Sequence, residues 1–222
     1  MIVGEQKPIA EIKESIAPYS KILILGCGTC VKTCFAGGED EVAVLASALR
    51  LAFKKDGRKI EIEEKTIERQ CEDEFIQEAA VAISRNDAVL SLACGAGVQD
   101  IAKRFAKTPV LPGVNTTFIG ILEKQGLFTE ECLGCGDCML GMFGGICPIT
   151  RCSKKLLNGP CGGSMDGKCE VNPDIDCAWQ QIIDRLRLLG QLDNLRKYIP
   201  PKNWRASHAG GPRKLVREDH VI

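Results

Sequence analysis

Thirteen cysteines constrain this chain more than any other feature of its sequence. Eight of them lie between residues 132 and 177, and the run ECLGCGDCMLGMFGGICPITRC alone supplies five. An odd number of cysteines cannot all pair as disulfides, and the first residues, MIVGEQKPIAEIKE, lack the charged-then-apolar order of a signal peptide. We therefore expect a cytoplasmic protein, whose reducing surroundings favour thiolate ligands to a metal over disulfides.

The composition excludes several classes of partner. The chain has 222 residues, 45% of them hydrophobic, which is enough for an ordinary core in one or two domains. Lysine plus arginine equals aspartate plus glutamate, at 29 each, so no net charge favours nucleic acid or an anionic membrane surface. No apolar run reaches the ~18 residues of a membrane-spanning helix. The sequence predicts a soluble protein without a nucleic-acid partner and without membrane insertion.

Residues 1–127 alternate short apolar runs with amphipathic ones, which predicts an α/β domain. We expect strands at 21–26, 58–64, 87–94 and 108–114, and helices at 39–55, 72–84 and 97–107. Such an alternation is typical of a small Rossmann-like or flavodoxin-like domain, a parallel sheet flanked by helices.

The pattern changes near residue 128. Residues 128–176 are rich in cysteine and glycine and show almost no periodicity, so this segment is expected to fold around its ligands rather than around an apolar core. Residues 177–222 begin with helical spacing at 177–199, where Ile182, Ile183, Leu186, Leu189 and Leu192 form one face. After Pro200 and Pro201 the tail is either an extended arm or disordered.

Five thiols lie at or just after the ends of the first three expected strands: Cys27, Cys30, Cys34, Cys71 and Cys94. The carboxyl ends of parallel strands meet at one edge of a sheet, so these thiols should converge there. A [4Fe-4S] cluster uses four thiolates and nearby backbone amides, which Gly26, Gly28, Gly95 and Gly97 would leave open.

Other interpretations account for fewer of these residues. Buried cysteines can be small hydrophobic residues, and CGTC has the shape of a thioredoxin-like dithiol, but neither explains five thiols at one edge. A nucleotide-binding loop fails because Val31 stands where GxGxxG requires its third glycine. Zinc would need four of the five thiols and remains the competing metal.

The spacing CxxCxxC of Cys132, Cys135 and Cys138 is that of an iron–sulfur loop, in which three thiolates hold three irons of a cubane. The fourth ligand is open among the remaining five cysteines, with Cys147 and Cys161 favoured. We expect two [4Fe-4S] clusters in the chain, and the thiols suffice for a third. No catalytic residues are predicted, because both histidines lie in the tail and no hydrolase, HExxH or Walker motif is present.

The segments GCGTCVKTCFAGGEDEVAVLASALR, RQCEDEF, SLACGAGVQ, CLGCGDC, CPITRCSKKLLNGPCGGSMDGKCEV and DCAW together resemble one family over about residues 20–200. This is the MetV-type small subunit of methylenetetrahydrofolate reductases from anaerobic bacteria such as acetogens, also described as the methylenetetrahydrofolate reductase C-terminal domain. The resemblance implies iron–sulfur clusters in this chain and a complex with a flavin-bearing catalytic subunit.

The residues are compatible with that role. A reductase barrel of the TIM type needs about 250 residues, more than this chain supplies, so the catalytic centre and its FMN are expected on the partner subunit. This chain would transfer electrons between that flavin and a donor, either ferredoxin or a larger redox complex. The alternative is a structural subunit in which zinc or an idle cluster only folds the cysteine-rich segment.

Overall fold

The structure is a computed structural model that describes residues 1–220. It divides into two compact units, Met1–Phe128 and Thr129–Ile222, which we call unit 1 and unit 2. The last two residues of the segment 177–222, considered above, lie outside the described residues. In the part of the chain that the structure describes, no helix is long and apolar enough to cross a membrane.

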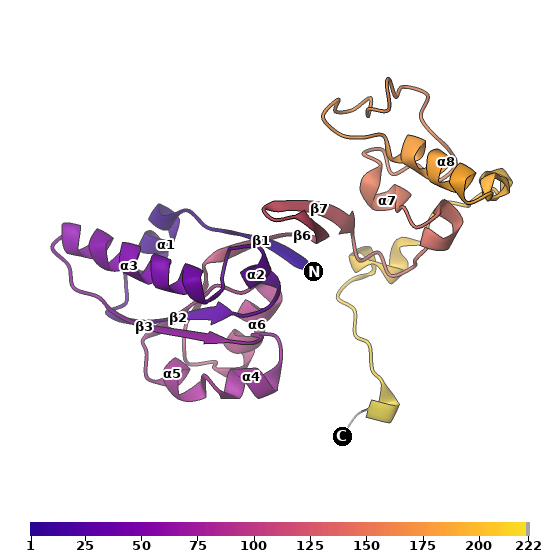
Figure 1. Ribbon diagram of the computed structural model, residues 1–222. Helices are drawn as coiled ribbons and strands as arrows, with labels where there is room; N and C mark the ends of the chain where they lie inside the picture. The colour runs from indigo at the N-terminus through magenta and orange to yellow at the C-terminus, as the bar shows by residue number, and fades with distance from the viewer. Residues whose placement is uncertain (221–222) are drawn as a thin grey trace. The chain divides into compact units, whose positions relative to one another are not determined.

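A four-stranded parallel sheet forms the centre of unit 1 (Figure 1). Its strands are β2 (Lys21–Cys27), β3 (Glu61–Ile67), β4 (Ala88–Ser91) and β5 (Val110–Pro112), and they lie in the order β3-β2-β4-β5. Counted within this sheet alone, the order is 2-1-3-4, which is the flavodoxin-like arrangement. The expected α/β fold class is therefore confirmed.

Helices cover both faces of this sheet because β2 is apolar on both sides. Ile22 and Ile24 face α1 (Ile9–Ile16) and α3 (Glu39–Lys55), whereas Leu23 and Leu25 face α4 (Asp73–Gln77), α5 (Ala80–Ser84) and α6 (Gly95–Arg104). Figure 1 shows α1 and α3 on one side of the sheet and α4 and α5 on the other. A strand buried on both faces reads as a continuous apolar run, as KILILG does.

A second sheet, which begins in unit 1 and whose last strand continues into the first residues of unit 2, was not expected from the sequence. It is antiparallel where β1 (Ile2–Gln6) pairs with β6 (Val114–Lys124), and its order is β1-β6-β7, with β7 spanning Leu127–Cys132. The short helix α2 (Cys30–Thr33) follows β2. The chain turns between β6 and β7 at Gly126, whose φ of 81° favours glycine.

Two boundaries in unit 1 differ from the sequence prediction. Strand β3 begins at Glu61 rather than at residue 58. The expected helix 72–84 is broken into α4 and α5, and the carbonyl of Glu78, at the break, accepts a hydrogen bond from Lys65 Nζ. At the break the backbone N–H groups of Glu78 and Ala79 donate to the carbonyls of Phe75 and Ile76, three residues back rather than four, as in a 3₁₀ turn.

Unit 2 contains short elements. They are the 3₁₀ turns η1 (Leu140–Phe143), η2 (Leu192–Arg196), η3 (Trp204–Ala206), η4 (His208–Gly210) and η5 (Glu218–His220), and the helices α7 (Pro148–Arg151) and α8 (Ala178–Leu188). Helix α8 ends earlier than the expected residue 199. It ends there because Gly190 adopts a left-handed φ of 66°, typical of a helix C-terminus.

Unit 2 has an apolar core, to which the cysteine-rich segment 128–176 contributes Phe143 and the segment 177–222 contributes the rest. Phe143 and Trp179 meet edge to face, with ring centroids 5.5 Å apart, and Cys177, Ile182 and Leu186 complete the buried cluster. Of the expected helix face, Ile182 and Leu186 are buried, but Leu189 and Leu192 are exposed. The core is small, since it contains only five buried residues.

Candidate metal centres

The topological switch point of the parallel sheet lies between β2 and β4, where the chain connections diverge to the two sides. Cys27 is the last residue of β2, and Cys94 is the N-cap residue of α6, which follows β4. In open α/β sheets, ligands bind at this crevice outside the carboxyl ends of the strands. The positive end of the α6 dipole at Cys94 further favours negative charge here.

Cys71 belongs to the same group of thiols. Burial raises the pKa of the Cys71 thiol, and negative charge at Cys94, Cys27 and Cys30 raises that pKa further. Such an influence weakens with distance, so the thiols of Cys94, Cys27 and Cys30 lie in the neighbourhood of Cys71. The structure therefore brings together four of the five expected thiols, from three strand ends and the start of α2.

Cys34 lies apart from this group. Its sulfur is 3.6 Å from the carbonyl oxygen of Ile2 in β1. Burial raises the pKa of the Cys34 thiol, a backbone hydrogen bond from Gly4 lowers it, and Cys30 is the one cysteine whose charge contributes to the shift. Cys34 thus faces the antiparallel sheet, which the sequence analysis did not foresee.

A buried glutamine next to this thiol group links strands β2 and β4, and the sequence analysis did not identify it. Gln70 is fully buried, donates from Nε2 to the Leu25 carbonyl of β2 at 2.7 Å, and accepts at Oε1 from the Ser91 hydroxyl of β4 at 2.6 Å. The Ser91 hydroxyl in turn accepts from the backbone N–H of Ala93. This chain of bonds holds the two strand ends at fixed separation and positions Cys71 and Cys94, which follow directly.

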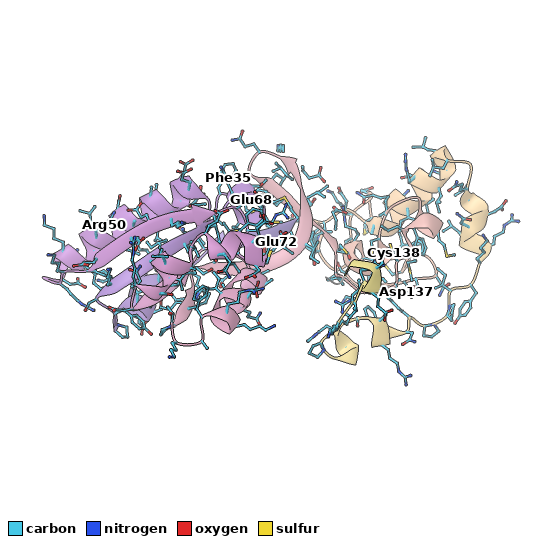
Figure 2. The ribbon with its side chains drawn as sticks, turned by 90° about the horizontal axis from the view of Figure 1, so that it is seen from below. Phe35, Arg50, Glu68, Glu72, Asp137 and Cys138 are labelled. Carbon is cyan, nitrogen blue, oxygen red and sulfur yellow. The ribbon has the colours of Figure 1, made fainter. Side chains whose placement is uncertain are left out.

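The backbone N–H groups of Gly28 and Gly95 at this edge already donate hydrogen bonds within the protein, so they are less available to a cluster than expected. Gly28 N–H donates to the carbonyls of Ile67 and Glu68, and Gly95 N–H donates to Thr116 Oγ1 at 2.8 Å. Figure 2 shows Glu68 and Glu72 at the same end of unit 1 as Phe35. Phe35 follows Cys34, is 54% exposed and has φ of 55°, a conformation that a bulky side chain rarely adopts.

The CxxCxxC loop of unit 2 lines a cavity of about 340 Å³. Four sulfurs border it, from Cys132, Cys135, Cys138 and Cys147, together with apolar side chains such as Leu133 and Leu140. Gly134 and Gly136 take left-handed φ values of 59° and 80°, which let the loop coil, and Gly134 N–H donates to Cys132 Sγ at 3.3 Å. Of the two favoured candidates for the fourth ligand, the structure places Cys147 with this loop.

The C-terminal tail passes over the same loop. The Lys202 side chain, 1% exposed, donates to the Asp137 carbonyl at 2.8 Å and to Asp137 Oδ2 at 3.0 Å. Arg213 donates to the Gly134 carbonyl at 2.8 Å. A Cβ at Gly136 would lie 2.2 Å from the carbonyl oxygen of Ala206, so glycine is required for this approach. We call residues 202–213 the tail strap.

Cys161, the other favoured candidate, lies elsewhere, in a cavity of about 20 Å³ that is also lined by Cys152, Cys169 and Cys177. The thiol of Cys161 donates to Glu170 Oε2 at 3.2 Å. The hydrogen bond between Cys169 Sγ and Ser153 Oγ, and hydrogen bonds with the backbone of Val171 and Asn172, hold the pKa of the Cys169 thiol below its ordinary value. Twelve of the thirteen thiols thus fall into three groups of four, with Cys34 left over.

Among residues 1–220, no three His, Cys, Asp or Glu side chains converge tightly enough to hold a metal ion. For a tetrahedral zinc site, the Zn–S length of ≈ 2.3 Å requires sulfurs about 3.8 Å apart. The thiolates of a cubane each bind a different iron, so they stand further apart than the ligands of one ion. The thiol groups at the sheet edge and around the 340 Å³ cavity match a cluster in donor type and number.

Residues 111–205 match the family model described as "Methylene-tetrahydrofolate reductase C terminal". The match contains all eight thiols of unit 2, whereas the five thiols of unit 1 lie outside it. No curated protein and no solved structure matches the chain. The segment that carries two of the three thiol groups is thus the one related to methylenetetrahydrofolate reductases.

Proposed function

We propose that this chain is the electron-transfer iron–sulfur subunit of a methylenetetrahydrofolate reductase complex of the MetV type. The observation that carries the proposal is the sorting of the thiols into groups of four, within a chain whose residues 111–205 match the reductase family. A [4Fe-4S] cluster, when bound, accepts and releases one electron at a time, which is the chemistry that links a one-electron donor to a flavin.

Two sets of residues would hold the clusters. In unit 1 we assign Cys27, Cys30, Cys71 and Cys94, because the first two and Cys94 lie at the carboxyl ends of β2 and β4 in the neighbourhood of Cys71, whereas Cys34 Sγ bonds to the Ile2 carbonyl of β1. In unit 2 we assign Cys132, Cys135, Cys138 and Cys147, which border one cavity of sufficient volume. Zinc remains the competing metal for either set, since it uses the same thiolates.

The protein's other groups would tune and protect these sites. The N-terminal amides of α6 and the Gly134 N–H point partial positive charge toward thiolates, and the Lys202 ammonium places a full positive charge on the CxxCxxC loop. Hydrogen bonds and net charge around the sulfurs set the potential at which such a site is reduced. The apolar lining of the unit 2 cavity would limit access of water.

The partner in this proposal is a catalytic subunit that carries FMN and binds the folate, with ferredoxin or a larger redox complex as the electron donor. An exposed aromatic residue held in a conformation that costs energy is typical of a functional surface. Phe35, which follows Cys34 at the same end of unit 1 as Glu68 (Figure 2), is such a residue, and we place the docking of a partner there.

The test is reduction of the partner's flavin. The intact complex should let a low-potential one-electron donor reduce the flavin rapidly, and this chain alone should reduce no folate. Complex from which the clusters have been removed by chelation, with its subunits still associated, is the control and should reduce its flavin far more slowly. Equal rates in the two preparations would replace the proposal with the structural-subunit alternative.

A further inference from the structure

We propose that the hydroxyl of Thr150, in α7, donates a hydrogen bond to a sulfur of the cluster assigned to unit 2 and raises the potential at which that cluster is reduced. Thr150 lines the cavity of about 340 Å³ together with the thiols of Cys132, Cys135, Cys138 and Cys147. The inference rests on the proposed function, because it concerns the group that these thiols would hold. It adds a residue to which the spacing of the cysteines does not point.

The hydroxyl of Thr150 is a buried polar group without a partner. Its oxygen is shielded from solvent, and within residues 1–220 nothing forms a hydrogen bond with it. Buried polar side-chain atoms are nearly always hydrogen-bonded, because leaving one unpaired costs free energy. An unpaired hydroxyl beside a cavity that four thiols border therefore points to a partner bound in that cavity.

The helix that carries Thr150 does not satisfy the hydroxyl. A threonine in a helix commonly bonds back to the carbonyl three or four residues earlier. Three residues before Thr150 is Cys147, whose carbonyl accepts from the backbone N–H of Arg151 at 2.9 Å. Of the described residues, neither Cys147 nor Ile146, four residues earlier, accepts from Thr150 Oγ1. The hydroxyl keeps its donor capacity for another acceptor.

The two carboxylates that line the same cavity are already paired. Glu131 forms an ion pair with Arg151, and Asp137 Oδ2 lies 3.0 Å from Lys202 Nζ. Among the described side chains that line the cavity, Thr150 is the one oxygen-bearing group without a partner. The cavity thus combines four sulfurs, two neutralised carboxylates and one free hydroxyl donor, which suits a bound group whose surface accepts hydrogen bonds.

The position of Thr150 is fixed relative to one of the thiols. Cys147 is the N-cap residue of α7, and residues three apart on a helical turn are neighbours. Pro148 and Ile149 are buried, and Arg151 pairs with β7, so α7 is held in one orientation. Threonine carries its hydroxyl and its methyl group on the same Cβ, and one staggered step of χ1 exchanges them. The hydroxyl therefore reaches the cavity without a movement of the backbone.

A hydrogen bond from Thr150 would favour the reduced form of the cluster. Reduction adds one electron, which comes from the one-electron donor of the proposed function, and the hydroxyl keeps its proton, so no covalent bond breaks. A hydrogen bond to an acceptor strengthens with the negative charge on that acceptor. The bond is therefore stronger in the reduced form, and hydrogen bonds to the sulfurs are among the factors that set the potential of such a cluster.

The experiment is a redox titration of full-length protein, followed by electron paramagnetic resonance, on wild type, Thr150→Val and Thr150→Ser. Valine has the shape of threonine without the donor, and serine keeps the donor. At a fixed solution potential, the ratio of reduced to oxidised unit 2 cluster should fall about tenfold in Thr150→Val, equivalent to about 59 mV for a one-electron couple. Thr150→Ser should keep the wild-type ratio, and the unit 1 cluster is the internal control in all three proteins.

Iron and acid-labile sulfide should stay at the wild-type level in both variants, which separates a change of potential from loss of the cluster. Equal ratios in wild type and Thr150→Val would overturn the inference and leave the proposed function standing. The same fall in Thr150→Val and Thr150→Ser would also overturn it, because the effect would then not depend on the hydroxyl. Wild-type protein without sulfide would instead overturn the proposed function, and this inference with it.

Discussion

At the scale of single residues, the five thiols of unit 1 are not equivalent. Cys94 caps α6 at the switch point, and its charge raises the pKa of Cys71, whereas Cys34 lies against the Ile2 carbonyl of β1. The sequence shows that all five follow strands, but it does not show which way each side chain points. That direction depends on β1, a strand that the sequence analysis did not identify.

This difference predicts that serine substitutions at Cys94 and at Cys34 have different effects on iron and sulfide content. Cys94→Ser should lower iron by about four per chain, one cluster's worth, and lower sulfide equally, because a ligand is lost. Cys34→Ser should keep the wild-type content of both. The measurement is iron and sulfide analysis of anaerobically purified protein, and the assignment fails if Cys34→Ser loses a cluster while Cys94→Ser retains all of them.

At the scale of elements, the parallel sheet was predictable and the antiparallel sheet was not recognised. β2 and α3 are long and strongly patterned, and they occur where the sequence places them. The hairpin of β6 and β7 has a signal in LEKQGLF, where a turn with glycine lies between apolar runs. The sequence analysis placed a domain boundary there instead, because the cysteine-rich segment begins nearby. The helical part of the unit 2 core follows from the spacing of Ile182 and Leu186, whereas Phe143 lies in a 3₁₀ turn of a segment that shows no periodicity.

The tail strap is the element whose role the sequence left open, between an extended arm and disorder. In the structure, Lys202 and Arg213 donate to carbonyls of the CxxCxxC loop of the same chain, which neither an arm around a partner nor disorder had predicted. The long separation in sequence, 65 residues from Lys202 to Asp137, explains why no local pattern could reveal this contact.

We expect Lys202→Met to loosen the CxxCxxC loop. Hydrogen bonds to charged groups contribute about 1.5–3 kcal/mol, and the exposure of Asp137 reduces this to about 1 kcal/mol. That loss corresponds to a roughly fivefold increase in loop opening. The bleaching rate of the unit 2 cluster in air should rise by a similar factor, and Lys214→Met, at an exposed position of the same tail, is the control. Equal bleaching in both variants would show that the strap does not protect the loop.

At the scale of the whole molecule, the two units differ in the number of thiol groups that they contain. Unit 1 offers one group of four at the switch point of a flavodoxin-like sheet, and unit 2 offers two groups, one around each of two cavities. The sequence identified the cysteines as candidate ligands, and metal binding by them stays a prediction. It could not divide eight cysteines of unit 2 into two sets, because spacing alone allows Cys147 and Cys161 equally, and only the folded segment separates them.

Acid-labile sulfide per chain tests the central claim most directly, because inorganic sulfide belongs to iron–sulfur clusters and is absent from zinc sites. Anaerobically purified wild-type protein should contain about eight sulfides and about eight irons, the content of two [4Fe-4S] clusters. Protein that contains zinc on these thiols and no sulfide would contradict the account and leave a structural subunit in its place.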